Sequence, residues 1–282
     1  MVVAMVLSGT IGLFVLASGQ SPLTVVFFRC LIGGLALIAW LSWRGGWRPL
    51  DRRAAVWLLL GAVALILNWL CLFTAYRLSS ISVATVVYHV QPFFLILLAA
   101  LSQREMPSRS RMVWLALAFV GVAMTSGIEL GTGGLGGMLP GVLLALAAAF
   151  LYALATLATR KLPDLPPAQI AGLQLILGVV ALAPLADFSG DLSGVNAWGS
   201  LLILGLVHTG LMYNLMYAAF QRLPAAMVAS LSFIYPVVAM LVDFVFFHIA
   251  LSPVQVSGIL LIMLAVVANQ KSWDLRVLRT SS

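Results

Sequence analysis

Long runs of apolar positions, separated by short polar or Gly/Pro-rich stretches, make up almost the whole chain. Each run is continuous, which is typical of membrane-spanning helices, whereas a membrane barrel would show alternation every second residue. Turn-forming residues lie between the runs, as at Gly45-Gly46 and Ser252-Pro253. The pattern therefore predicts an all-α polytopic membrane protein. We expect ten transmembrane helices, over residues 2–18, 23–43, 54–76, 81–102, 111–128, 139–159, 167–187, 197–220, 224–247 and 253–270.

Composition supports a membrane protein and excludes a soluble one. Of 282 residues, 63% are hydrophobic and 8% are charged, whereas a soluble domain carries about 25% charged residues. The net charge of +7 does not indicate a nucleic-acid partner, because the basic residues occur singly or in small groups between apolar runs. We expect the lipid bilayer to be the protein's surroundings.

The basic residues also predict how the chain is oriented. Of the 15 Lys and Arg residues, thirteen fall on one side of the ten expected helices, Arg77 falls on the other, and Arg29 lies within the second helix. The positive-inside rule then places both termini in the cytoplasm. We expect a multi-pass protein of the bacterial inner membrane.

Weak internal similarity at a spacing of 145 residues divides the chain into two copies. Gly33 aligns with Gly178, and Arg77-Leu78 aligns with Arg222-Leu223; Pro92 and Pro236 align after a slip of one residue. Five spans in each copy make the second copy enter the membrane upside down, which is the inverted-repeat architecture of many transporters. The expected boundaries are 1–130 for the first five-helix repeat, 138–271 for the second, and 272–282 for a short cytoplasmic tail.

Several short motifs, in this order and spacing, resemble the EamA-type branch of the drug/metabolite transporter (DMT) superfamily, and most of all the YddG-type aromatic amino-acid exporters. The motifs are Ser21-Pro22, Tyr76-Arg77-Leu78, Gln221-Arg222-Leu223-Pro224-Ala225 and Leu251-Ser252-Pro253-Val254-Gln255. The resemblance implies export of amino acids by alternating access, in which helices 1–4 and 6–9 rock around a cavity while helices 5 and 10 lie at the periphery. Two positions depart from the family pattern: Ser8-Gly9 stands in place of Trp-Gly, and Ile249 in place of a glutamate.

Two helices interrupted by proline point to the solute site. Pro92 and Pro236 lie inside the fourth and ninth expected helices, and paired broken helices at matching positions often carry the site of a transporter. Tyr88, His89 and Tyr235 lie beside these kinks. The alternative interpretation is that these polar side chains only hydrogen-bond one helix to another.

A second group of candidates comes from the third, sixth and eighth helices. Asn68 and Trp69 match Tyr213 and Asn214 in the repeat, and Tyr152 lies in the sixth helix. Aromatic rings with polar tips suit a small amphipathic solute. They equally suit the aromatic belts at the two membrane surfaces.

Charged residues inside spans are candidates for charge partners of the solute or of each other. Arg29 and Asp243 are such residues. Neither a catalytic motif, nor metal-ligand spacing, nor a cofactor motif is present, so we expect neither an enzyme nor a metal or cofactor site. The expected partner is a small-molecule solute, and a monomer is plausible. A multidrug exporter of lipophilic cations, a channel and a membrane-embedded enzyme stay open as alternatives.

Overall fold

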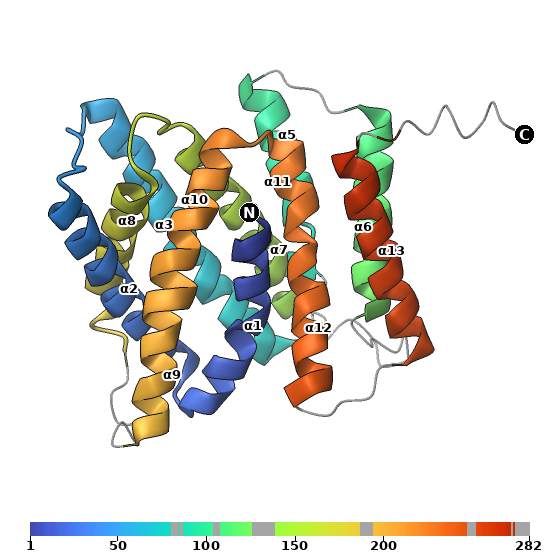
Figure 1. The fold of residues 1–282 in the computed structure, drawn as a ribbon, viewed down its shortest axis with the longest axis horizontal. Coiled ribbons are helices and arrows are strands. Elements are labelled where there is room, and N and C mark those ends of the chain that lie inside the picture. The colour runs from blue at the N-terminus through green and yellow to red at the C-terminus, as the bar shows by residue number, and fades with distance from the viewer. Residues whose placement is uncertain are drawn as a thin grey trace, which may run out of the picture. The chain divides into compact units, whose positions relative to one another are not determined.

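The computed structural model describes residues 1–79, 84, 87–103, 108–125, 139–186, 194–246, 252–271 and 273. All regular secondary structure in these ranges is helical (Figure 1). The elements are α1 (Val2–Ser18), α2 (Pro22–Arg44), α3 (Arg52–Leu78), α5 (Gln91–Gln103), α6 (Arg109–Thr125), α7 (Leu139–Arg160), α8 (Pro167–Leu182), α9 (Val195–Gly205), η2 (Leu206–Leu211), α10 (Met212–Arg222), α11 (Ala225–Ser232), α12 (Ile234–Phe246) and α13 (Pro253–Gln270).

The helices fall where the apolar runs predict them, and the all-α polytopic fold is confirmed. The first and last expected helices, 2–18 and 253–270, have the bounds of α1 and α13. Among the described residues, five segments are long and apolar enough to cross a membrane by length and composition alone, and four more apolar helices are shorter. Three expected helices are irregular: the fourth and ninth are broken near their prolines, and the eighth contains the π-helix η2, which the sequence does not predict.

Two of the motif prolines begin helices with hydrogen-bonded caps. Ser21 Oγ accepts from the backbone N–H of Thr24 at 3.2 Å, ahead of α2. Before α13, Ser252 Oγ accepts from Gln255 N at 3.3 Å, and Gln255 Oε1 accepts from Ser252 N at 2.8 Å. This capping box satisfies two backbone donors that a helix start otherwise leaves unpaired. The Ser-Pro motifs therefore have a structural role at the helix ends.

The chain forms two compact units, and each takes helices from both halves of the sequence. Unit 1 comprises residues 1–66 and 154–222, and unit 2 comprises residues 67–153 and 223–282. Within them α3 and α7 are continuous helices that contribute to both units. Each unit is described separately below.

In unit 1, α2 packs closely against α8, and the two helices run antiparallel. Glycines make the close approach: a β-carbon on Gly178 would meet Cys30, one on Gly34 would meet Leu175 and Ile176, and one on Gly172 would meet Leu37 and Ile38. As the residue numbers rise along α2, those of the contacts fall along α8. Small residues at such a crossing allow the backbones to approach, which is how helices associate in membranes.

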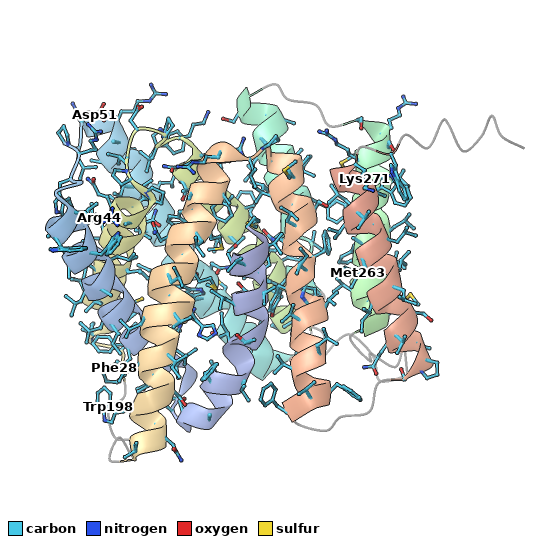
Figure 2. The ribbon with its side chains drawn as sticks, viewed as in Figure 1. Phe28, Arg44, Asp51, Trp198, Met263 and Lys271 are labelled. Carbon is cyan, nitrogen blue, oxygen red and sulfur yellow. The ribbon has the colours of Figure 1, made fainter. Side chains whose placement is uncertain are left out.

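One end of unit 1 gathers several basic loops. Gln169 at the start of α8 bonds both the N–H and the carbonyl of Arg48, at 2.9 and 2.8 Å. Arg160 donates to the carbonyl of Phe220 at 3.2 Å, so the ends of α7 and α10 meet here as well. Arg44 lies toward this end of α2, whereas Phe28, with its ring 5.3 Å from that of Trp198, lies toward the other (Figure 2).

In unit 2, α6 packs against α13, again antiparallel (Figure 1). A β-carbon on Gly121 would meet Ile262 and the carbonyl of Gly258. Nearer the start of α6, Trp114 Nε1 donates to the carbonyl of Trp273 at 3.1 Å. The basic start of α6 therefore lies at the same end as Lys271, which Figure 2 marks at the end of α13.

Candidate functional site

The two proline-containing spans are broken at matching positions in unit 2. The fourth span turns at His89 and Val90 before α5 begins, and the ninth turns at Phe233 between α11 and α12. Each break begins three residues before a buried proline, Pro92 or Pro236. A proline cannot donate to the carbonyl four residues earlier and its ring clashes there, which accounts for both kinks.

The breaks bring aromatic rings together. The imidazole of His89 stacks on the ring of Tyr235, with centroids 5.3 Å apart and planes 5° apart, and lies 6.4 Å from the ring of Phe233. Tyr88 meets Tyr152 of α7 edge to face at 6.0 Å. We call these five residues, Tyr88, His89, Tyr152, Phe233 and Tyr235, the aromatic cluster.

Asn68 of α3 is buried and hydrogen-bonds to Tyr88 of the aromatic cluster. Its side chain has no exposed surface. The amide nitrogen donates to the carbonyl of Ala148 at 2.7 Å and to the hydroxyl of Tyr88 at 3.2 Å. Its Oδ1 has no hydrogen-bond partner among the residues that the structure describes. A buried acceptor of this kind requires an explanation, since an unmade hydrogen bond is costly.

A second amide crosses between the broken helices. Gln91 Nε2 donates to Ser232 Oγ at 3.3 Å, while Ser232 Oγ donates to the carbonyl of Ala229 at 2.7 Å. Gln91 Oε1 and the hydroxyl of Ser230 are also buried without a partner in the described part of the chain.

In unit 1, the π-helix η2 holds a separate polar network. Thr209 Oγ1 donates to the carbonyl of Leu204, five residues earlier, at 2.8 Å, and accepts from Arg29 Nε at 3.0 Å. Arg29 is 5% exposed. A β-carbon on Gly33 would lie 2.7 Å from Thr209 Cγ2, so only glycine lets α2 approach η2 this closely. Widened turns of this type often occur at functional sites.

His208 of η2 connects the π-helix to α1. Its Nε2 lies 2.8 Å from Thr10 Oγ1, and its Nδ1 lies 3.4 Å from the carbonyl of Ile203. Thr10 Oγ1 in turn donates to the carbonyl of Leu7 at 2.8 Å. A hydroxyl has one proton, so when Thr10 gives it to Leu7, the proton between Thr10 and His208 must be carried by Nε2.

A third group in unit 1 centres on Gln174, the residue that matches Arg29 in the repeat. Tyr217 donates its hydroxyl proton to Gln174 Oε1 at 2.5 Å, and Gln174 Nε2 donates to the carbonyl of Leu58 at 3.4 Å. The ring of Tyr213 lies 5.6 Å from that of Tyr217. A β-carbon on Gly61 would lie 2.3 Å from Gln174 Nε2, so glycine provides the space for this amide.

The structure brings five of the predicted site residues together in unit 2: Asn68, Tyr88, His89, Tyr152 and Tyr235. Arg29 and Tyr213 belong to unit 1, where Arg29 joins the η2 network and Tyr213 lies beside the Gln174 group. The side chain of Asp243 lies outside the described residues, as does most of the expected tail over 272–282.

Burial decides against the aromatic belt for three of these candidates. Asn68, Trp69 and Tyr213 are at most 8% exposed, whereas belt residues would face lipid headgroups. Asn214 is partly exposed.

Sequence reasoning missed several polar residues that form hydrogen bonds within these groups. Thr10, Thr209 and Gln91 are polar residues in apolar runs, and that isolation was the available signal. Among the described residues no set of three His, Cys, Asp or Glu side chains could hold a metal ion.

Helices of this length and hydropathy, in a bundle with buried polar networks, define an integral membrane protein with many spans. Comparison with known proteins gives the family. The sequence model of the EamA-like transporter family matches residues 1–127 and 139–269. The chain belongs to this family, whose members are transporters.

Relatives agree in length as well as in sequence. The chain is 32% identical over 267 residues to the uncharacterized transporter YxxF of Bacillus subtilis, covering 93% of this chain and 85% of that one. It is 27% identical over 265 residues to an uncharacterized transporter of Archaeoglobus fulgidus, covering 89% and 90%. A solved crystal structure at 22% identity shares the fold, with a TM-score of 0.85 over 95% of each chain.

Proposed function

We propose that this chain exports amino acids, aromatic ones included, across the bacterial inner membrane by alternating access. The observation that carries the proposal is the aromatic cluster of unit 2, beside the buried amide of Asn68. Rings of Tyr88, Tyr152 and Tyr235 are partly exposed, and tyrosines offer both an apolar face and a polar tip to a solute. The kinks beside them are of the kind that transporters use to line a site.

The antiparallel helix pairs support an inverted repeat, with copies at 1–130 and 138–271. α2 and α8 occupy the same position in the two copies, and so do α6 and α13. In each pair the contacting residue numbers run in opposite directions. Two copies that face opposite sides of the membrane would place their equivalent helices this way, whereas two copies with the same orientation would place them parallel.

The shared ends of the helices support the proposed orientation. In unit 1, hydrogen bonds hold Arg48, in the loop after α2, and Arg160, the last residue of α7, at one end. In unit 2, the start of α6 with Arg109 and Arg111 lies at the same end as Lys271. By the positive-inside rule these ends face the cytoplasm, and both termini with them.

Transport by purified protein in liposomes tests the proposal. Vesicles loaded with unlabelled phenylalanine or threonine should take up the labelled amino acid by counterflow, and empty or heat-treated vesicles should not. Uptake of a labelled lipophilic cation without any amino acid would contradict the proposal and establish a multidrug exporter. Substitution of Tyr235 with Ala should lower the rate, because it removes one face of the His89 stack.

A further inference from the structure

We propose that Asn68 Oδ1 binds the ammonium group of the exported solute, with the rings of Tyr88 and Tyr152 beside it. This inference rests on the proposed function, since it assigns one part of the solute to one part of the same cluster. The residues come from three segments of unit 2: α3, the helical residues just before the turn that precedes α5, and α7.

The hydrogen bonds of Asn68 fix which way its amide points. The carbonyl of Ala148 can only accept a proton, so the amide atom 2.7 Å from it is the nitrogen. The second proton of that nitrogen goes to the hydroxyl of Tyr88. Both donors are therefore used, and the oxygen alone is left without a partner among the described residues.

A hydrogen-bond donor from a bound ligand would explain why this buried oxygen has no partner among the described residues. Leaving such an acceptor unmade costs about 1–3 kcal/mol. Gln91, the first residue of α5, repeats the arrangement: its nitrogen donates to Ser232 Oγ and its oxygen has no described partner. Unit 2 therefore holds two buried amide oxygens that have no donor among the described residues.

The surrounding rings favour a cation over an anion. The face of a tyrosine ring carries negative charge density, which attracts an ammonium group and repels a carboxylate. Tyr88 connects the two features, since its ring meets that of Tyr152 and its hydroxyl bonds Asn68. Both tyrosines are partly exposed while Asn68 is not, so a ligand would reach the amide past the rings.

Four ligands are used to measure how much the ammonium group contributes to binding, apart from the rest of the solute. Phenylalanine is compared with 3-phenylpropanoate, which lacks the amine, and phenethylamine is compared with 2-phenylethanol, which replaces the amine by a hydroxyl. Binding of each to the purified full chain is measured by calorimetry, in sodium chloride and in choline chloride. The variant is Asn68→Leu, which keeps the size and removes the acceptor.

Asn269→Leu is the matched control. Asn269 is a buried asparagine of α13 whose buried, unpartnered atom is the donor Nδ2 and not the oxygen, so it lacks the buried, unpartnered acceptor that Asn68 offers. The readout is the ratio of affinities within each pair of ligands. This ratio does not depend on the fraction of folded protein, so a general loss of folding in either variant would leave it unchanged.

We expect the wild-type protein to bind each amine roughly 10- to 100-fold more tightly than its partner ligand, the effect of one hydrogen bond to a charged group. Asn68→Leu should bring the ratio close to one, and Asn269→Leu should preserve it. A ratio near one in the wild-type protein, a ratio unchanged by Asn68→Leu, or a ratio that appears only in choline because sodium occupies the site would each overturn the inference.

The same measurements separate this inference from the proposed function. If liposomes transport phenylalanine but the affinity ratio is one, the transporter proposal stands and the ammonium site is wrong. If phenethylamine shows the Asn68-dependent preference while no amino acid is transported, the ammonium site stands and the proposed substrate class is wrong. Absence of binding by all four ligands would contradict both.

Discussion

A cysteine introduced at Gly178 should form a disulfide with the native Cys30 and thereby test the antiparallel packing of α2 and α8. A β-carbon at Gly178 would lie 3.8 Å from Cys30 Cβ and 3.0 Å from Cys30 Sγ. Disulfides have a mean Cβ to Cβ separation of about 3.8 Å. Gly178→Cys should therefore form the bond without movement of either helix.

The bond would close a loop of roughly 150 residues. Loop-closure entropy gives an upper limit of about 5 kcal/mol for the stabilisation, which the restricted unfolded state of a membrane protein reduces. The oxidised variant should need a higher fraction of dodecyl sulfate for unfolding in mixed micelles than the reduced one. Because the added side chain takes up space beside Cys30, the reduced variant should be no more stable than the wild-type protein.

The assay uses a protease site inserted within residues 131–137, between the two sequence copies, in a chain whose Cys71 is replaced by Ala. After mild oxidation and cleavage, the two fragments of Gly178→Cys should stay joined until reductant is added. Two controls should separate at once: the same variant carrying Cys30→Ala, and Gly172→Cys, whose β-carbon would face Leu37 and Ile38. Separation of the Gly178→Cys fragments, or joining at Gly172→Cys, would refute the register.

Two further predictions concern unit 1. Thr209→Val should destabilise the protein in mixed-micelle unfolding by about 1.5–3 kcal/mol, because the buried Arg29 loses a hydroxyl acceptor. Thr209→Ser keeps the hydroxyl and should lower the stability by about 1 kcal/mol, because a methyl group is lost. An equal loss of stability in the two variants would contradict a role for the hydroxyl. Tyr217→Phe and Gln174→Leu should couple by about 0.6–1.7 kcal/mol in a double-mutant cycle, and strictly additive effects would show that their hydrogen bond contributes nothing.

Helix positions followed from the sequence because a membrane imposes a long apolar run on each span. The bounds of α1 and α13 match the expected ones, and Ser252-Pro253 could be recognised as a helix start from its residue types alone. Tyr88, His89 and Tyr235 could be grouped because prolines mark kinks and the kinks lie at matching places in the repeat. Local chemistry determines all of these features.

Contacts between distant segments could not be predicted in this way. The π-helix η2 differs from an α-helix by one residue in its hydrogen-bond register, and no apolar periodicity records that shift. The partner of Asn68 is the backbone carbonyl of Ala148, a group that every residue carries and no sequence pattern marks. No sequence pattern marks the pairing of the Thr10 and His208 side chains either, because the two residues are 198 positions apart.

The structure also corrects the alignment of the two sequence copies around the broken helices. At a spacing of 145, the counterpart of His89 is Ile234. The broken helices show instead that His89 and Phe233 begin the two breaks, a spacing of 144 that the prolines share. These counterparts lie in contact, 6.4 Å apart between ring centroids. Under the proposed inverted repeat, a residue that contacts its own counterpart lies close to the pseudo-twofold axis relating the copies.

Arg29 and Gln174 show how the two copies use one position differently. Arg29 donates to Thr209 in the eighth span, and Gln174 donates to the carbonyl of Leu58 in the third span. The third and eighth spans are counterparts in the two copies, as are positions 29 and 174. The neutral amide of Gln174 needs only a backbone carbonyl of the regular helix α3, and Gly61 provides the space for it. A buried guanidinium needs stronger acceptors. The π turn, in which Thr209 Oγ1 both accepts from Arg29 and donates to Leu204, provides one of them. We infer that the charge at position 29 is the reason why the eighth span widens at this point and the third span does not.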